Sequence, residues 1–167
     1  MAQMDPWCSL KITSEMLIEA TTTDAPRIVL AAAMADALVG AVMFRPRDGN
    51  SFMFMRKFGE ALARHWGRPW PCDPDKLPAG GYVNALAVFP NWQGHGIGKT
   101  LLSAAEAVTA EQSPRIYLSV SESNVDARRM YESVGYRLVG TVHDCLREGN
   151  TELLHLKPLR IAGAART

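Results

Sequence analysis

The chain has 167 residues, of which 47% are apolar and 21% are charged, and its net charge is +1 at neutral pH. This length predicts one domain, residues 1–167, with a single core. The balanced charge argues against partners bound by bulk electrostatic attraction, such as nucleic acid or an anionic membrane.

Targeting signals and cysteine spacing indicate the cellular compartment of a protein. No apolar run is long enough to span a bilayer, and the first ten residues lack the basic start and apolar centre of a secretory signal. The three cysteines lie far apart and form no C-x-x-C pair. Together these features predict a cytoplasmic protein with reduced thiols.

The N-terminal part predicts a helix and then a hairpin. Ser9–Ala20 repeats apolar residues at helical spacing. After a polar break, Arg27–Ala33 and Leu38–Phe44 have the composition of two antiparallel strands joined by a turn around Asp36. Gly40 is expected to form a bulge in the second strand.

A long segment, residues 45–81, separates this hairpin from the next strand. Phe52–Trp66 can form an amphipathic helix, and Arg68–Pro78 carries four prolines that predict an extended loop. Insertions of this length in compact domains are usually functional or disordered, and the aromatic content argues against disorder. We expect the segment to line the acceptor site or an oligomer contact, as in a homodimer; packing on the sheet edge is the alternative.

The rest of the chain is organised around Val83–Leu102, which reads VNALAVFPNWQGHGIGKTLL. Its apolar run ends at Pro90, which cannot donate a ladder hydrogen bond. Three alternating glycines then precede a helix whose apolar face is predicted to hold Ile97, Leu101, Ala105 and Val108. Such a strand, glycine loop and helix start direct backbone N–H groups and a positive dipole end at an anion. A phosphorylated ligand is therefore expected here.

Several kinds of loop compete for this stretch. The Gly98-Lys99-Thr100 run fits the end of a Walker A loop, but Gln93 stands where that loop needs its first glycine. The glycine spacing is wrong for a dinucleotide fingerprint. The stretch could also be a plain strand-to-helix turn that binds no ligand. The pattern Q/R-x-x-G-x-G/A is matched by Gln93, Gly96 and Gly98, and it is the pyrophosphate signature of the GCN5-related N-acetyltransferases.

The second half predicts a strand, a helix and two more strands. The helix that follows the glycines should end near Gln112, before a buried strand over Arg115–Val120. Ser123-Asn124-Val125-Asp126 has the form of a capping box, and Gly135 fits the left-handed end of the next helix. The last strands, Tyr136–Val142 and Thr151–Leu156, flank a polar turn. The fold class is therefore α/β, with a mixed, largely antiparallel sheet and one β-α-β crossover.

A second motif lies in this half. The pattern N-x-x-A-x-x-x-Y-x-x-x-G-[FY] is matched by Asn124, Ala127, Tyr131, Gly135 and Tyr136. With both motifs in the expected order, the chain resembles the GCN5-related N-acetyltransferase (GNAT) family from about Arg27 to Leu156, with a core of about residues 27–157. That resemblance implies a further strand and two helices at the start, for which the first 26 residues are too short. The first strand of the family is therefore expected to be missing.

The resemblance also implies a site for acetyl-CoA, with no metal. The pantetheine arm would lie along Leu86, Ala87 and Val88, where the backbone N–H near Val88 would polarise the acetyl carbonyl. Asn124 would hydrogen-bond that arm or serve only as a helix-start residue. Tyr131 would protonate the departing thiolate. The pyrophosphate would rest on the loop residues Gln93, Gly94, His95, Gly96, Ile97, Gly98 and Lys99, among which His95 and Lys99 have no settled role.

The expected reaction is direct transfer of an acetyl group to a primary amine of a small molecule, amino acid or peptide. The alternatives are transfer of a longer acyl group, a non-catalytic acyl-CoA-binding sensor and, least of all, a P-loop nucleotide hydrolase. Several family members have a glutamate at the position of Ser119 that acts as the general base, and a serine cannot accept the proton without help from another group. Other carboxylates and histidines are open as bases, and none is assigned: Glu15, Glu122, His143, Asp144 and Glu152.

Overall fold

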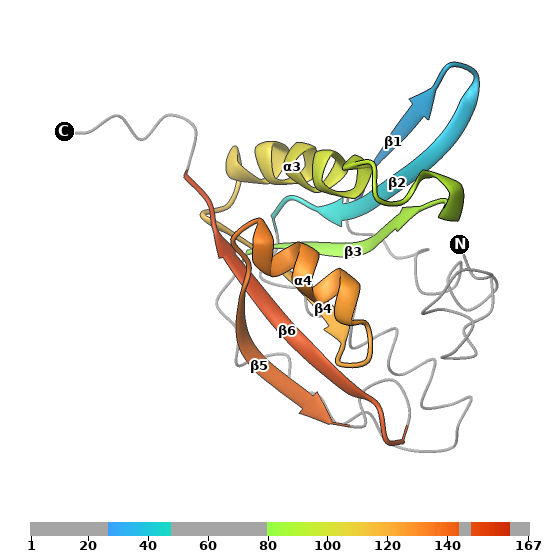
Figure 1. Cartoon of the computed structure of the whole chain (residues 1–167). Helices are drawn as coiled ribbons and strands as arrows, with labels where there is room; N and C mark the ends of the chain where they lie inside the picture. The colour runs from blue at the N-terminus through green and yellow to red at the C-terminus, as the bar shows by residue number, and fades with distance from the viewer. Residues whose placement is uncertain (1–26, 48–79, 144–147, 161–167) are drawn as a thin grey trace. The chain divides into compact units, whose positions relative to one another are not determined.

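A computed structural model describes residues 27–47, 80–143 and 148–160. Its six strands form one sheet in the order β1-β2-β3-β4-β6-β5 (Figure 1). By contacts the chain divides into two compact units, each described by itself. The α3 unit holds β1, β2, β3, α3, β4 as far as Leu118 and β6 from Leu156 onward; the α4 unit holds the rest of β4, α4, β5 and the start of β6.

The α3 unit begins with the predicted hairpin. β1 (Ile28–Met34) pairs antiparallel with β2 (Ala37–Arg45). Their register shifts between Ala32 and Ala33, beside Gly40, where the bulge is predicted. A Cβ on Gly40 would lie 2.8 Å from the carbonyl oxygen of Ala87, so only glycine lets the next strand approach this closely.

The crossover is formed as predicted. β3 (Gly81–Val88) pairs antiparallel with β2 and parallel with β4 (Arg115–Ser121). The connection between the two parallel strands runs through the short 3-10 helix η2 (Pro90–Trp92) and the helix α3 (Ile97–Ala110). This mixed, largely antiparallel arrangement is the predicted fold class.

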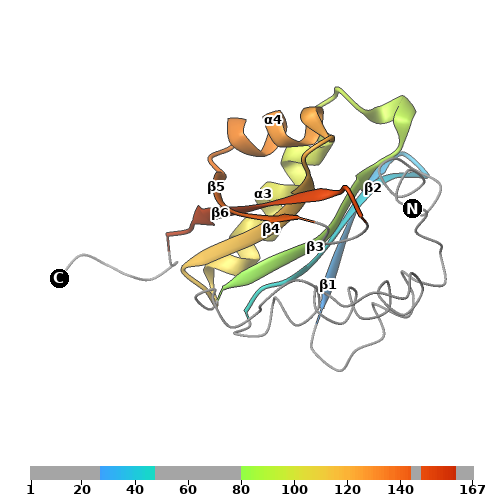
Figure 2. The ribbon, with the colours of Figure 1, turned by 90° about the horizontal axis from the view of Figure 1, so that it is seen from below.

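Helix α3 packs against β1, β2 and β3 and lies along one face of these strands (Figure 2). Its buried residues are Leu101, Leu102, Ala105 and Thr109. The predicted apolar face was wrong at its end, because Val108 is only half-buried and Thr109 takes the core position. Thr109 can be buried because its hydroxyl donates to the carbonyl oxygen of Ala105 at 2.7 Å, which satisfies the polar group.

The end of β6 (Thr151–Pro158) belongs to the α3 unit and contacts α3. Lys157 Nζ lies 2.6 Å from Glu106 Oε2, and both side chains are partly buried. The amide of Leu159 donates to the carbonyl oxygen of Pro114 at 2.8 Å. The strand therefore ends two residues later than the predicted Thr151–Leu156.

The α4 unit contains α4 (Val125–Ser133), β5 (Arg137–His143) and β6 as far as His155. β5 and β6 are neighbours in the sheet, and Figure 1 shows their arrows pointing in opposite directions, as a turn between them requires. Both strands lie within two residues of their predicted ranges.

Several expectations lie outside the described residues: the helix over Ser9–Ala20, the missing first strand, and both parts of the insertion, Phe52–Trp66 and Arg68–Pro78. Within the described ranges, no helix combines the length and the apolar character needed to cross a membrane.

Replacing Gly81 with alanine tests how tightly β3 is packed. The new Cβ would lie 2.5 Å from Thr109 Cγ2 and 2.9 Å from the carbonyl oxygen of Arg45. Because Thr109 is held by its hydrogen bond and the carbonyl belongs to a paired strand, we expect a loss of about 1–3 kcal/mol in the free energy of unfolding. Urea denaturation measures it. Gly140→Ala is the control, because its Cβ would meet only Leu154 at 3.8 Å and should leave stability equal or slightly higher.

Candidate active site

The glycine loop lies in the α3 unit, between the end of β3 and the start of α3. Gly94 and Gly96 have φ values of 78° and 81°, in the left-handed region that favours glycine. A Cβ on either would meet no atom within 4 Å, so both positions face open space. The loop therefore keeps its outer surface clear of side chains at these two residues.

Helix α3 begins at this open surface with unpaired amides. The first turn of hydrogen bonds starts at Thr100, whose amide donates to the carbonyl oxygen of Gly96 at 3.0 Å. The amides of Ile97, Gly98 and Lys99 come before this bond and have no acceptor within the helix. No side chain caps the helix, and its first turn has no acidic residue. These N–H groups and the helix dipole favour an anion here.

Side chains of the loop hold its backbone. Gln93 Nε2 donates to the carbonyl oxygen of Val88 at 3.0 Å, which ties the loop to the end of β3. His95 Nδ1 lies 2.8 Å from the carbonyl oxygen of Gln93, and its ring meets the edge of Trp92 at a centroid distance of 6.5 Å. Gln93 and His95 thus shape the loop, whereas Lys99 is exposed.

Among the residues that the structure describes, nothing pairs with one edge of the last part of β3. Parallel pairing with β4 ends at Val83, and Asn84 is the extra residue at a register shift against β2. The Phe89 amide donates to Val39 on the β2 side. Because successive amides in a strand alternate in direction, the Val88 amide points to the other edge. Leu86 and Val88 therefore present backbone groups along that edge, whereas those of Ala87, between them, face β2.

The α4 unit carries the second motif, and its first residue caps α4. Asn124 Oδ1 accepts a hydrogen bond from the amide of Ala127 at 3.2 Å. The capping box predicted to start at Ser123 was wrong by one residue, because the Ser123 hydroxyl lies 3.2 Å from Ser121 Oγ instead. Asn124 therefore has a defined helix-start role.

The end of α4 explains the remaining spacing of the motif. The amides of Gly135 and Tyr136 donate to the carbonyl oxygens of Glu132 and Tyr131, both at 3.1 Å, and Gly135 has φ 99°. This pair of bonds is a Schellman motif, in which a contact between the flanking side chains is common. Here the Tyr131 and Tyr136 rings lie 5.9 Å apart. The glycine and the second aromatic residue thus fix the position of Tyr131.

Tyr131 is 9% exposed. Burial, reinforced by the negative charge of Glu152, raises the pKa of its phenol to about 12. The hydroxyl therefore stays protonated at neutral pH and can donate a proton or a hydrogen bond.

A buried polar cluster in the α4 unit is formed by Ser119, Ser121, Asn150 and Glu152. Ser121 Oγ donates to Asn150 Oδ1 at 2.8 Å, and Asn150 Nδ2 donates to Glu152 Oε1 at 3.1 Å. Glu152 is 4% exposed. Burial raises the pKa of its carboxyl to about 7, although hydrogen bonds from Asn150 and Ser119 oppose the shift.

Two of the other open base candidates, Glu122 and His143, have no such setting. Glu122 and His143 are exposed, and His143 Nδ1 lies 3.2 Å from Thr151 Oγ1. Glu15 and Asp144 lie outside the described residues. One signal in the sequence singles out Glu152: it is an acidic residue at the start of an otherwise largely apolar strand.

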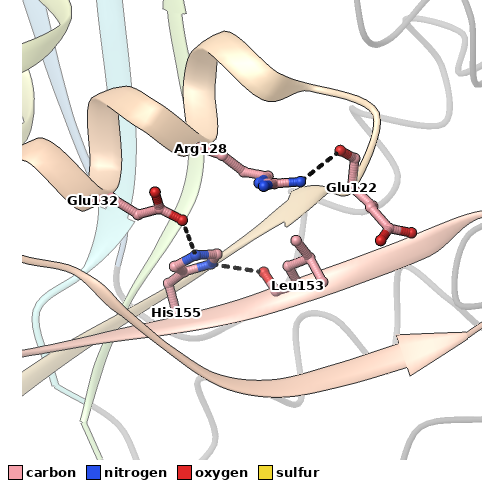
Figure 3. A network of polar contacts seen from close by, with 5 residues as sticks. All are labelled: Glu122, Arg128, Glu132, Leu153 and His155. Atoms are coloured by element: carbon pink, nitrogen blue, oxygen red, sulfur yellow. Dashed lines mark hydrogen bonds and ion pairs between the residues drawn. The ribbon is translucent and has the colours of Figure 1, made fainter.

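His155, also in β6, packs toward α4 (Figure 3). It is 1% exposed, with Nδ1 3.2 Å from the carbonyl oxygen of Leu153 and Nε2 3.9 Å from Glu132 Oε1. Arg128 Nη1 donates to the carbonyl oxygen of Glu122 and ties α4 to the end of β4. Because side chains alternate along a strand, Glu152 lies on the opposite face of β6 from His155. The histidine therefore belongs to the packing of α4.

Sequence comparisons agree with these features. The model of the acetyltransferase (GNAT) family matches residues 3–136. A mycothiol acetyltransferase from Acidothermus cellulolyticus is 29% identical over 104 residues, 56% of this chain and 32% of that protein. The spermine/spermidine N(1)-acetyltransferase of Bacillus subtilis is 33% identical over 70 residues, 41% of this chain and 46% of that protein. The chain thus matches less than half the length of each of these relatives.

Solved structures share the fold. One is a protein of Bacillus anthracis named as a streptothricin acetyltransferase and solved in complex with acetyl coenzyme A. The TM-score is 0.60 at 16% identity, and the match covers 84% of this chain and 68% of that one. At this identity the likeness establishes the architecture, including the crossover between β3 and β4.

Proposed function

The chain belongs to the acetyltransferase (GNAT) family, and from that premise we propose that it transfers the acetyl group of acetyl-CoA directly to a primary amine. The observation that carries the proposal is the open loop at the end of β3, where the amides of Ile97, Gly98 and Lys99 face a surface kept clear by Gly94 and Gly96. This arrangement suits the pyrophosphate of a coenzyme.

The unpaired edge of β3 suits the rest of the cofactor. The pantetheine arm carries amide groups that can pair with the outward-facing backbone groups of Leu86 and Val88 and lie along Ala87 between them, as an added strand would. The Val88 amide then faces the thioester and can stabilise the negative charge that develops on the carbonyl oxygen. Asn84, whose two side-chain polar atoms are buried without a hydrogen-bond partner, lies next to this edge and is a further group available to a ligand.

The acceptor is proposed to be a small primary amine. The names of the matched relatives point to mycothiol and to the polyamines spermine and spermidine, which puts spermine and spermidine first among acceptors to test. Amino acids and peptide N-termini follow, because nothing in the loop or in the β3 edge selects the amine. An acyl group longer than acetyl is the second candidate, since the phosphate site makes no contact with the acyl chain.

A thiol-release assay tests the proposal. Purified protein, acetyl-CoA and one amine at a time should release coenzyme A thiol at a rate that depends on the amine, with one acetylated amine formed per thiol. The matched control is butyryl-CoA with the same amine. Faster turnover with butyryl-CoA would favour the longer acyl group. Binding of acetyl-CoA with no thiol release across the panel would contradict an enzyme and support an acyl-CoA sensor.

A further inference from the structure

The hydrogen bonds of the buried polar cluster converge on Glu152. Because Ser121 donates to Asn150 Oδ1, the amide of Asn150 is oriented with its Nδ2 toward Glu152 Oε1. Ser119 adds a second hydrogen bond to the same carboxyl group. Two strands and the turn before β6 thus combine to hold one carboxylate in a fixed position.

This setting is unusual for a carboxylate with a purely structural role. Within the described residues, no lysine or arginine forms an ion pair with Glu152. A buried carboxylate without a cation lowers stability, and a glutamine of the same shape would fill the place without that cost. Buried acids held by hydrogen bonds and without a neutralising partner are characteristic of proton-transfer groups.

We propose that Glu152 is the general base that accepts the proton of the acceptor ammonium, and that Ser119 and Asn150 are positioning residues for it. The inference rests on the proposed function and names the group that removes the proton. Nothing in the sequence motifs assigns this role to β6.

The ammonium gives one proton to the carboxylate of Glu152, and the neutral amine attacks the thioester carbonyl carbon. The new C–N bond forms as the C–S bond breaks, and the sulfur keeps the electron pair. Tyr131 gives its hydroxyl proton to the sulfur, and the second proton released by nitrogen restores the phenol. The products are the amide, the coenzyme A thiol and a protonated Glu152.

The titration of Glu152 fits this step. An alkyl ammonium has a pKa of about 10.4, and raising the pKa of the base from 4.5 to about 7 narrows the gap between donor and acceptor. The carboxyl group accepts hydrogen bonds from Ser119 of β4 and Asn150 of the turn before β6, and its charge acts on Tyr131 of α4. His143 of β5 lies 3.2 Å from Thr151 Oγ1 instead.

Because folding raises this pKa, the folded state binds more protons between pH 4.5 and about 7. The contribution of Glu152 to stability is therefore fully present below pH 4.5 and is lost as the pH rises through about 7. A comparison with Glu152→Gln at the two ends of this window isolates that contribution.

The test measures kcat against pH for four proteins with acetyl-CoA and an amine that the wild type acetylates. The kcat of the wild type should rise with pH, and this rising limb of the pH profile should be centred near pH 7. Glu152→Gln should lower kcat by about 10²-fold or more and lose this limb, while acetyl-CoA still raises its melting temperature. Ser119→Ala should move the limb to higher pH, because the carboxylate loses a donor. The control Glu122→Gln makes the same chemical change at an exposed site and should match the wild type.

The outcomes separate the two claims. A wild type without amine-dependent thiol release overturns the acetyltransferase proposal and the base together. A wild type that turns over, beside a folded Glu152→Gln protein with the same kcat and the same limb, overturns the base alone. If Glu152→Gln does not fold, Ser119→Ala decides: a limb at the wild-type pH would contradict the assignment.

Discussion

Gly96→Asp is expected to abolish the rise in melting temperature that acetyl-CoA gives the wild-type protein. The position faces open space at the start of α3, so the new carboxylate would project where the pyrophosphate is proposed to lie. Two negative charges a few Å apart repel each other. A ligand at 100 times its Kd stabilises the folded state by about 2.7 kcal/mol, and the variant should lose nearly all of it. Thermal unfolding with and without acetyl-CoA measures the effect.

Gly96→Asn is the matched control for this experiment. Asparagine has almost the shape of aspartate and tolerates positive φ equally well, but it carries no charge. It should keep part of the acetyl-CoA shift, whereas aspartate should keep little. Equal shifts for the wild type and Gly96→Asp would remove the loop from the cofactor site. Equal losses for both variants would mean that bulk alone, rather than charge, excludes the ligand.

The parts of the site that sequence predicted are those built from neighbouring residues. The loop from Gln93 to Gly98 depends on glycines at fixed spacing and on a helix that follows at once, so its pattern is local. Gly135 is likewise a local signal, because a helix that ends in a left-handed residue selects glycine. Both were therefore visible before any tertiary contact was known.

Tertiary packing decided what the sequence left open. Thr109 rather than Val108 reaches the core, because the threonine can satisfy its own hydroxyl within the helix. Ser123 and Asn124 both suit a helix start, and the contact between Ser123 and Ser121 decides between them. Glu152 was one of five open candidates because part of its environment comes from residues far away in the chain. Ser119 lies 33 positions before it, and Ser121, which orients Asn150, lies 29 positions before Asn150. No spacing rule brings such residues together.

A large effect on the chemical step is also expected from Tyr131→Phe. The ring stays in its contact with Tyr136, and the Schellman bonds use only backbone groups, so the variant should fold as the wild type does. Only the hydroxyl is lost. If Tyr131 protonates the thiolate, kcat should fall by about 10²-fold or more, with acetyl-CoA binding nearly unchanged. Tyr136→Phe removes a hydroxyl from the neighbouring ring and should keep kcat near the wild-type value.

The pKa of Tyr131 links this acid to the proposed base. A phenol with a pKa of about 12 is a poor acid for a thiolate whose conjugate acid has a pKa of about 8.5. Part of that elevation comes from the charge of Glu152, which disappears when Glu152 takes the proton of the ammonium. The first proton transfer therefore makes Tyr131 a better acid for the second.

This coupling predicts that the pKa of Tyr131 is lower in Glu152→Gln than in the wild type. Ultraviolet titration of tyrosine ionisation, with Tyr131→Phe as the blank for each background, measures the difference. An unchanged pKa would mean that the charge of Glu152 does not act on Tyr131, and that Tyr131 serves as an acid independently of Glu152. Wild-type turnover in a folded Tyr131→Phe protein would assign the hydroxyl to packing rather than to catalysis.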